Sequence, residues 1–416
     1  MTVPSRAPKP SRHVMVMVTG RDRPGITAKL TGLIRELGAQ LVDIEQVVIQ
    51  GHLSLGLVIG ITEDRGVLKE LLFAAKELGV SLDFHPVDPP VVQDPQGLPP
   101  RYVVTAIGPT LGAAELHDLA TTLADHGANI RRIGRLSFGD LRSLEVQVEL
   151  PSAGVEATLR GALLRLGMRG AMDLALQREG LFRRSKRLVV LDMDSTLIRI
   201  EVIDELARAH GVLKEVSAVT ERAMAGEMDY DESLRQRLAL LRGMDVSVLE
   251  RIAAELPLTE GAERLVYVLK RLGYRIAVIS GGFSIAAESL KQKLGIDYAF
   301  SNTLEVKDGK LTGNVVGPIV NGKRKAELLE RIAGAEGVLL DQVIAVGDGA
   351  NDLAMLERAG LGIAFRAKRK LREAADASIS TGGLDAILYL LGIPGMELEE
   401  ILPPQLGSLP PVAAQS

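Results

Sequence analysis

Residues 188–197 read LVVLDMDSTL, and this stretch indicates the fold that the surrounding chain must complete. Four apolar residues lead into Asp192, and Asp194 follows two positions later. A short apolar run that ends on a polar residue is typical of a parallel strand buried on both faces. Because two carboxylates so close together repel each other, we expect a cation to stabilise them.

Two later runs repeat this pattern. YRIAVIS ends at Ser280 and QVIAVGD ends at Asp348, while GLGIAF and ASIS resemble further strands with helical segments between them. This alternation predicts an α/β domain with a parallel sheet. In open parallel sheets, ligands bind beyond the carboxyl ends of the strands. We therefore expect Asp192, Ser280 and Asp348 to meet at one edge.

The two aspartates of DMDST suit covalent phosphoryl chemistry. A carboxylate such as Asp192 can attack phosphorus and form an acyl phosphate, which splits one difficult hydrolysis into two steps. Asp194 can protonate the leaving oxygen and then deprotonate the attacking water.

The segment VGDGANDLAML adds Asp352 to Asp348, so four carboxylates would face a phosphate dianion. Such a site needs positive charge, and oxygen ligands without Cys or His favour Mg²⁺. Lys325, which opens a helix in NGKRKAELLE, can supply a second cation, with Lys323 as its rival. The hydroxyl of Ser280 and the glycines after it can approach a phosphate closely.

Two segments before this domain resemble each other. Residues 14–49 and 102–138 each contain a strand, a glycine turn (at Gly20 and at Gly108), a helix and a second strand, and each continues through a strand, a helix and a last strand. The plan is β-α-β-β-α-β, which is ferredoxin-like. We expect these α+β domains at residues 12–90 and 101–179, joined by the Pro-rich linker PPVVQDPQGLPP.

The α/β domain is expected at residues 185–395. Residues 200–257 show few strand signals and are too long for one crossover helix, so we interpret them as a helical cap above the active edge. From residue 396, Pro and small polar residues predict a mobile tail, 396–416.

Composition excludes several classes of function. The chain has 416 residues, no Cys and a net charge of −4, which leaves no disulfide, no thiolate chemistry and no charge footprint for nucleic acid. No apolar run reaches the ~18 residues that span a bilayer, and the first residues lack a signal-peptide core. We therefore expect a cytoplasmic protein that does not bind a membrane.

DMDST, SGG, a lysine before a helix and GDGAND together resemble the four motifs of the haloacid dehalogenase superfamily. Over nearly all of residues 185–395, the blocks GEMDYDESLRQRL, VISGGF, DYAFSN, DGKLTG and AVGDGANDLAM resemble phosphoserine phosphatases. The two repeats resemble ACT domains, with GRDRPGI as the first turn. The whole chain is similar to the two-ACT type of this family found in actinobacteria.

The resemblance implies roles for individual residues. Asp192 would be the nucleophile and Asp194 the acid and base, and Mg²⁺ would bind Asp192, Asp348 and the backbone carbonyl of Asp194, with support from Asp352. The phosphate would contact Ser280, Gly281 and Lys325. The amino-acid part of phosphoserine would contact a second set of residues: Glu201, Arg237, Asn351 and the apolar cap position Met224. Tyr230 stands where the resemblance leads us to expect Phe, which leaves its contact with the substrate open.

Three alternatives remain open at this point. The chain could hydrolyse another small phosphate monoester or transfer the phosphoryl group to another acceptor. It could also be an amino-acid sensor with an inert phosphatase unit, although the motif set is intact. Finally, the repeats could both bind serine and join two chains in a homodimer, or they could only join the two chains. For a serine site we expect Gly20 and Asp22 in the first repeat and, with less charge, Gly108 in the second.

Overall fold

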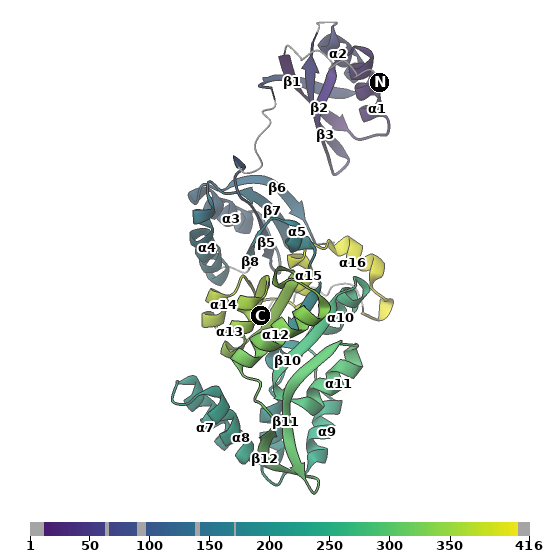
Figure 1. Cartoon of the computed structure of the whole chain (residues 1–416). Helices are drawn as coiled ribbons and strands as arrows, with labels where there is room; N and C mark the ends of the chain where they lie inside the picture. The colour runs from purple at the N-terminus through teal and green to yellow at the C-terminus, as the bar shows by residue number, and fades with distance from the viewer. Residues whose placement is uncertain (1–11, 63–65, 90–96, 138–141, 170–171, 407–416) are drawn as a thin grey trace, which may run out of the picture. The chain divides into compact units, whose positions relative to one another are not determined.

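The computed structural model describes residues 12–62, 66–89, 97–137, 142–169 and 172–406 (Figure 1). The chain divides into two compact units, Met1–Leu98 and Pro99–Ser416. Most of the predicted linker lies at residues 90–96, outside the described residues. No helix in the described ranges combines the length and the apolar character needed to cross a membrane.

The first unit has the predicted order of strands and helices. Its sheet is antiparallel with the strand order β2-β3-β1-β4, and two helices cover one face. The elements are β1 (Arg12–Arg21), α1 (Ile26–Glu36), β2 (Gln40–Ile49), β3 (His52–Ile61), α2 (Val67–Leu78) and β4 (Val80–Val87).

The second repeat has the same topology inside the second unit. Its strand order is β6-β7-β5-β8, again antiparallel. The elements are β5 (Arg101–Ile107), α3 (Ala113–Asp125), β6 (Asn129–Arg135), β7 (Ser143–Glu149), α4 (Glu156–Arg169) and β8 (Asp173–Arg178). The prediction of two ferredoxin-like repeats is therefore confirmed.

The sequence suggested a turn at Gly20, but Gly20 lies inside β1. It is needed there because a Cβ on Gly20 would stand 2.8 Å from Cγ1 of Val80 on the neighbouring strand β4. The turn is formed at Gly25, which directly precedes α1 and has a φ of +98°. In the second repeat, Gly108 follows β5 and donates its amide to the carbonyl of Arg142.

The rest of the second unit is built on a seven-stranded sheet with the order β12-β11-β10-β9-β13-β14-β15. All neighbouring strands are parallel except the edge pair β11 and β12, a hairpin that the strand patterns did not predict. The strands are β9 (Leu188–Leu191), β10 (Arg275–Phe283), β11 (Tyr298–Lys307), β12 (Lys310–Val316), β13 (Val343–Gly347), β14 (Leu361–Phe365) and β15 (Ala377–Ile379).

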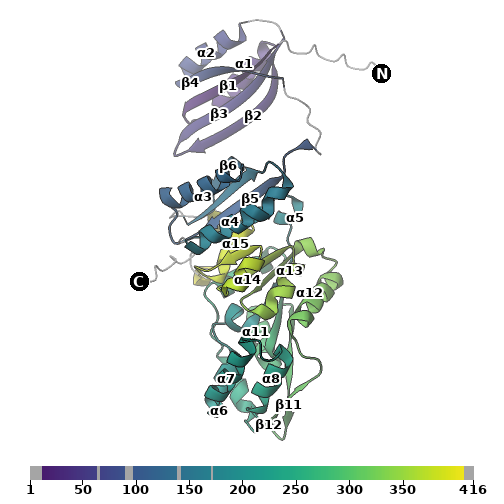
Figure 2. The ribbon, with the colours of Figure 1, turned by 90° about the vertical axis from the view of Figure 1, so that its left-hand side faces the viewer.

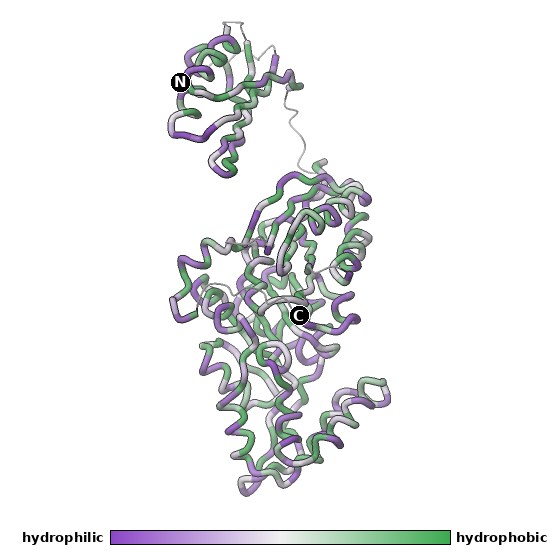
Figure 3. Tube along the Cα trace, turned by 180° about the vertical axis from the view of Figure 1, so that it is seen from behind, coloured by the Kyte–Doolittle hydropathy of each residue, from purple (hydrophilic) through white to green (hydrophobic). Residues whose placement is uncertain are grey.

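Apolar residues bury both faces of this sheet, which explains why β9 has no polar side. Val189 and Leu191 pack into the core that contains α10 (Ala262–Arg271) and α11 (Ser284–Leu294). Leu188 and Val190 point to the opposite core, which contains α12 (Gly322–Glu336) and α13 (Leu353–Arg358). Helices α11, α12 and α13 are labelled in Figure 2, and Figure 3 shows hydrophilic and hydrophobic residues mixed along the Cα trace.

The predicted cap is a run of four helices between β9 and β10. They are α6 (Val202–His210), α7 (Leu213–Met224), α8 (Tyr230–Ala239) and α9 (Val246–Ala254). A bridge between Ile198 and Leu258 joins the beginning and end of this insertion. The cap also rests on the hairpin, because the amide of Gly243 donates to the carbonyl of Leu311 at 2.8 Å.

The prediction of a mobile tail from residue 396 is wrong for residues 396–406. Helices α15 (Ile387–Leu390) and α16 (Gly395–Ile401) follow the sheet, and Leu398 is buried in the core. Proline-rich composition did not reveal this, because the few apolar side chains of the segment find a surface only in the folded unit. Residues 407–416 lie outside the described residues.

Candidate active site

The carboxyl end of β9 places the first two aspartates. The amide of Asp192 donates to the carbonyl of Val346 on β13 at 2.9 Å, which fixes the strand end. The chain then turns through Met193–Leu197, where Ser195 adopts a left-handed φ of +57°. This turn keeps Asp192 and Asp194 at one edge, and both carboxylates are buried.

Lys325 supplies the positive charge that these carboxylates need. Its Nζ lies 2.6 Å from Oδ1 of Asp192 and 2.7 Å from Oδ1 of Asp352. The Lys325 side chain is fully buried, whereas 88% of the Lys323 side chain is exposed. Of the two rival lysines, Lys325 is therefore the one that the fold brings to the site.

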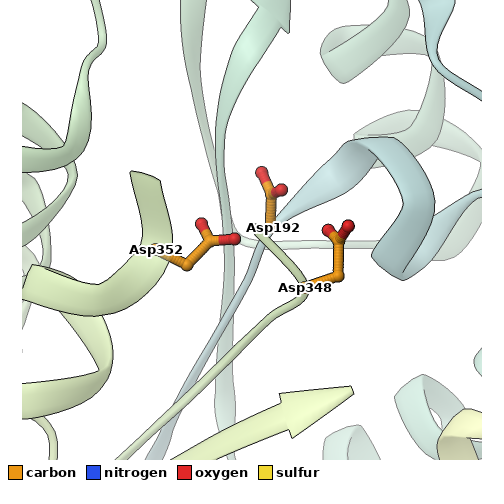
Figure 4. Close-up of side chains that lie close together, drawn as sticks. All are labelled: Asp192, Asp348 and Asp352. Carbon is orange, nitrogen blue, oxygen red and sulfur yellow. The ribbon is translucent and has the colours of Figure 1, made fainter. Parts of the chain in front are cut away.

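Asp348 completes a cluster of three carboxylates (Figure 4). Oxygen atoms of Asp192, Asp348 and Asp352 lie within 4.8 Å of one another. The hydroxyl of Thr196 donates to Asp348 at 3.1 Å. The two oxygens of Asp352 accept from Lys325 and from the amide of Gly349. Asp352 thus holds the lysine and the loop, while Asp192 and Asp348 face the shared space.

Burial and mutual repulsion perturb these groups. Burial, then the charge of Asp352, raises the pKa of Asp192 well above its ordinary value. The same two causes raise the pKa of Asp348 to about 7. Burial alone would lower the pKa of Lys325, but the charges of Asp192 and Asp352 raise it above its ordinary value. The protein therefore keeps one cation among several carboxylates that lack enough positive charge.

Asp194 has a different environment from Asp192. Its Oδ1 accepts the amide of Val202, the first residue of α6, at 2.9 Å, and its Oδ2 accepts the hydroxyl of Ser280 at 3.1 Å. Burial, then the charge of Glu201, raises the pKa of Asp194 to about 7. A carboxyl group held in this way is oriented and can gain or lose a proton near neutral pH.

The glycines after Ser280 are required by space. A Cβ on Gly282 would stand 2.4 Å from Oδ2 of Asp194 and 2.7 Å from Cε of Met193. The amide of Gly282 donates to the hydroxyl of Ser280 at 2.8 Å. The end of β10 thus packs directly against the turn that follows β9.

The structure brings Glu201, Arg237 and Asn351 toward this edge by different contacts. Glu201 accepts the hydroxyl of Ser195 at 2.7 Å. Arg237 lies on α8; burial raises the pKa of Tyr230 on the same helix, and the charges of Lys325 and Arg237 lower it. Asn351 lies beside the start of α12, where its carbonyl would be 2.9 Å from a Cβ on Gly322.

The two remaining cap residues differ from each other. Tyr230 donates its hydroxyl to the carbonyl of Gly281 at 3.2 Å. Met224 is 68% exposed at the end of α7, where Nζ of Lys368 lies 3.4 Å from its sulfur. A contact between Met224 and a substrate therefore stays a prediction.

Comparisons with known proteins agree with this geometry. Residues 186–360 match the model of haloacid dehalogenase-like hydrolases, and residues 12–85 and 101–177 match ACT domains. A phosphoserine phosphatase of Streptomyces coelicolor is 44% identical over 390 residues, which is 93% of each chain. One from Mycobacterium tuberculosis is 41% identical over 93% of this chain and 94% of its own.

The chain belongs to the phosphoserine phosphatase family. It is a hydrolase with a haloacid dehalogenase-like domain and two ACT domains. Among solved structures, a Salmonella enterica hydrolase of the haloacid dehalogenase family superposes with a TM-score of 0.61 at 30% identity, over 70% of this chain and 98% of its own. A probable phosphoserine phosphatase of Vibrio cholerae gives 0.54 at 34% identity, over 73% and 89%.

The carboxylates of this phosphatase family member fit a divalent metal ion. Asp192 and Asp348 present oxygens to one space, and burial, then the charge of Asp352, raises the pKa of both, which is the setting in which a bound cation favours the charged carboxylates. The donors are hard oxygens, which suit Mg²⁺. Among the described residues, these two and Asp352 form the only group of three or more acidic or His side chains whose ligand atoms come this close together.

Sequence reasoning assigned no role to two residues that hold the site of this phosphatase. Thr196 was visible inside DMDST, and its hydroxyl orients Asp348. Asn302 is 1% exposed on β11, and its Nδ2 donates to the carbonyl of Gly281 at 2.7 Å. A buried amide gives no periodic signal, so only the block DYAFSN could have drawn attention to it.

Proposed function

We propose that this chain hydrolyses O-phospho-L-serine to L-serine and phosphate, with Mg²⁺, through an aspartyl phosphate on Asp192. The observation that carries the proposal is the position of Asp192, which Lys325 holds at 2.6 Å beside Asp348 at the edge of the sheet. The names of the relatives support phosphoserine as the substrate.

In the first step, a carboxylate oxygen of Asp192 attacks phosphorus and the bond from phosphorus to the serine oxygen breaks. Protonated Asp194 gives its proton to that leaving oxygen. Its pKa of about 7 suits this role, because the carboxyl group carries a proton in part of the molecules at neutral pH. Serine leaves, and the phosphoryl group stays on Asp192.

In the second step, Asp194 accepts a proton from a water molecule that attacks the phosphoryl group. The acyl phosphate bond breaks, phosphate leaves, and Asp192 becomes a carboxylate again. Ser280 and the backbone at Gly281, together with Lys325, would bind the phosphate oxygens. Ser280 and Gly281 lie near the carboxyl end of β10, and Lys325 on α12 contacts Asp192, which directly follows β9; these positions support the assignment.

Asp192, Asp348 and the backbone carbonyl of Asp194 would hold Mg²⁺, with Asp352 in support. When bound, the ion neutralises charge on the carboxylates and on the phosphate. Removing it with a chelator should abolish phosphate release, and added Mg²⁺ should restore it. Activity that survives complete chelation would contradict a role for the metal.

Specificity for phosphoserine would come from the cap. The substrate carries an ammonium and a carboxylate group besides its phosphate, and Glu201 and Arg237 offer one opposite charge for each. Asn351 would lie beside the substrate, and Met224 and Tyr230 would close the space above it. The contact of Glu201 with Ser195 in the catalytic turn supports this arrangement.

One assay tests the reaction and its main rivals. Phosphate release is measured with Mg²⁺ from phosphoserine, phosphothreonine and p-nitrophenyl phosphate, for the whole chain and for Asp192→Asn. We expect phosphoserine to have the highest kcat/KM and the variant to lose turnover by many powers of ten. Equal use of all three esters would favour a general phosphomonoesterase. No turnover with any ester would favour an amino-acid sensor.

We also propose that the first ACT domain binds an amino acid, with L-serine as the leading candidate, and that the ACT domains join two chains. Asp22 supports this because it follows β1 with an exposed side chain. In the second repeat, Thr110 stands at the position of Asp22. The carboxylate of Glu115 accepts the amide of Gly112 at 2.8 Å. The bland alternative is that the repeats only dimerise.

The division of the chain decides how this regulation is tested. Because the second repeat shares one unit with the phosphatase sheet, only Met1–Leu98 should be removed. Serine titration by calorimetry and serine inhibition at fixed phosphoserine are compared among the full chain, this truncation and Asp22→Ala. Inhibition that is lost with residues 1–98 and weakened by Asp22→Ala supports sensing. Identical inhibition in all three proteins would mean that serine acts only as a product at the active site. Whether the ACT domains join two chains is then decided by the molecular mass of the full chain and of the truncation in solution.

A further inference from the structure

The first two residues of helix α8 connect the cap to both elements that surround Asp192. The hydroxyl of Tyr230 donates to the carbonyl of Gly281, at the end of β10, at 3.2 Å. The next residue, Asp231, accepts from Nδ2 of Asn321 at 3.0 Å. Asn321 caps α12, because its Oδ1 accepts the amide of Arg324 at 3.0 Å. One end of one helix thus contacts the strand of Ser280 and the helix of Lys325.

The carbonyl of Gly281, which accepts the hydrogen bond from Tyr230, is also held by a second side chain. Asn302, on β11, donates to the same oxygen of Gly281 at 2.7 Å and accepts the amide of Val320 at 2.8 Å. A Cβ on Gly281 would stand 2.0 Å from the hydroxyl oxygen of Tyr230. The tyrosine therefore fits above this residue only because it is a glycine and because its carbonyl is held in place.

The Tyr230 hydroxyl is a donor at working pH. The pKa of Tyr230 is raised to about 12, mainly because the side chain is buried. The group therefore keeps its proton, and the hydrogen bond to Gly281 persists over the physiological range.

Arg237 lies seven residues after Tyr230 on α8. Residues seven apart on a helix lie on the same face, so Tyr230 and Arg237 face the same side of α8. The Nε of Arg237 donates to the carbonyl of Ser233, one turn earlier, at 3.4 Å. A shift at the start of α8 would therefore move the guanidinium.

We propose that the Tyr230 hydroxyl is a latch that closes the cap onto the carbonyl of Gly281 and so positions Arg237 over the substrate. This inference rests on the proposed hydrolysis of phosphoserine. Tyr230 is then a positioning residue: its hydrogen bond stabilises the closed cap, in which Arg237 meets the substrate carboxylate. A phenylalanine at this position would fill the same space without the latch.

The test is Tyr230→Phe, which removes one oxygen atom. A hydrogen bond contributes about 0.5–1.5 kcal/mol, so KM for phosphoserine should rise about 2- to 10-fold. The parameters for p-nitrophenyl phosphate, which has no carboxylate, should change less than about 2-fold. Hydrogen exchange should become faster in peptides from residues 224–239 and stay unchanged in the sheet.

Tyr274→Phe is the matched control. Tyr274 is a partly buried tyrosine directly before β10, at the opposite end of the strand from Ser280, so its loss should change neither kinetics nor cap exchange. Asp231→Ala removes the second contact at the start of α8 and should also speed exchange in residues 224–239.

Three results would overturn the latch. The first is unchanged cap exchange in Tyr230→Phe. The second is an equal loss for both substrates, which would place the hydroxyl at the phosphate. The third is an equal effect of Tyr274→Phe. If the wild-type chain does not hydrolyse phosphoserine, the proposed function fails, and cap exchange in the two tyrosine variants still decides whether the latch exists.

Discussion

At the scale of single residues, Lys325 is the group on which the site depends most. It is fully buried between Asp192 and Asp352, which cannot both stay charged in that environment without it. A buried ion pair contributes little net stability, but removal of one partner leaves an uncompensated buried charge. The lysine is therefore both a structural cation and a candidate phosphate ligand.

Lys325→Met should lose activity by a factor of about 10³ or more, because Asp192 is then unpaired and the phosphate loses a cation. Stability should fall by about 3–5 kcal/mol, which is the usual cost of breaking a buried pair. Phosphate release and thermal unfolding measure the two effects. Lys323→Met is the control, since that side chain is exposed and its ion pair with Glu327 spans 4.0 Å. A comparable loss of activity in Lys323→Met would indicate that Lys323, and not Lys325, is the cation of the site.

Arg237 is the residue that should separate substrates. Arg237→Ala is expected to raise KM for phosphoserine by a factor of about 10 or more and to leave p-nitrophenyl phosphate almost unchanged, because only phosphoserine has a carboxylate. Steady-state kinetics with both esters measure this difference. If both esters suffer equally, Arg237 acts on the phosphate or on the fold, and the cap assignment is wrong.

At the scale of elements, the end of β10 and the turn after β9 are built around each other. Gly282 permits this contact, because no side chain fits between its backbone and Asp194. The same two elements also share the hydrogen bond from Ser280 to Asp194. Catalytic geometry is therefore set by the approach of two strand ends rather than by either one alone.

Gly282→Ala should reduce kcat about 100-fold or more, since its Cβ would push Asp194 out of position and proton transfer contributes roughly 10²–10⁴-fold. The fold should survive, because the affected segment is a single strand end. Gly334→Ala is the control: it lies in α12 with no packed neighbour within 4 Å of the added Cβ, so it should be neutral or slightly stabilising. Circular dichroism and phosphate release distinguish the two variants. Full activity of Gly282→Ala would contradict the argument.

At the scale of the whole molecule, the two repeats have different surroundings despite their common topology. In the second, β5 and β8 are buried on both sheet faces along most of their length, and Ile107 and Ala175 join the core of the phosphatase sheet. In the first repeat, every residue of β2 except Val42 is exposed, and the exposed fraction of Ile49 reaches 67%. The second repeat is thus part of the catalytic unit, while β2 of the first repeat keeps an open surface within its own unit.

Asp173 on β8 is the clearest link between the second repeat and the phosphatase sheet. Its Oδ2 accepts the amides of Ser380 and Thr381 at 2.7 and 3.0 Å and the hydroxyl of Thr381 at 3.1 Å. Asp173→Ala should lower the stability of the unit by about 1–3 kcal/mol, because partly buried donors at Ser380 and Thr381 lose their acceptor. Asp118→Ala, an exposed aspartate on α3, is the control. Equal melting temperatures for the two variants would show that the contact is not formed in solution.

The sequence alone determined the order of most strands and helices, the two repeats and the cluster of aspartates at one edge. These features follow from local rules: apolar runs form buried strands, and parallel strands bring their carboxyl ends to one edge. The grouping of Asp192, Asp194, Ser280 and Asp348 could therefore be predicted from the order of residues along the chain.

Only the tertiary structure decided which partners meet across long stretches of chain. Lys325 and Asp192 are 133 positions apart, Asp173 and Thr381 are 208, and Tyr230 and Gly281 are 51. Periodicity describes which face of an element is buried, but it carries no information about the atom that a buried polar group will contact. That choice depends on distances of a few ångström between elements, and these are set when the cap, the sheet and the second repeat pack together.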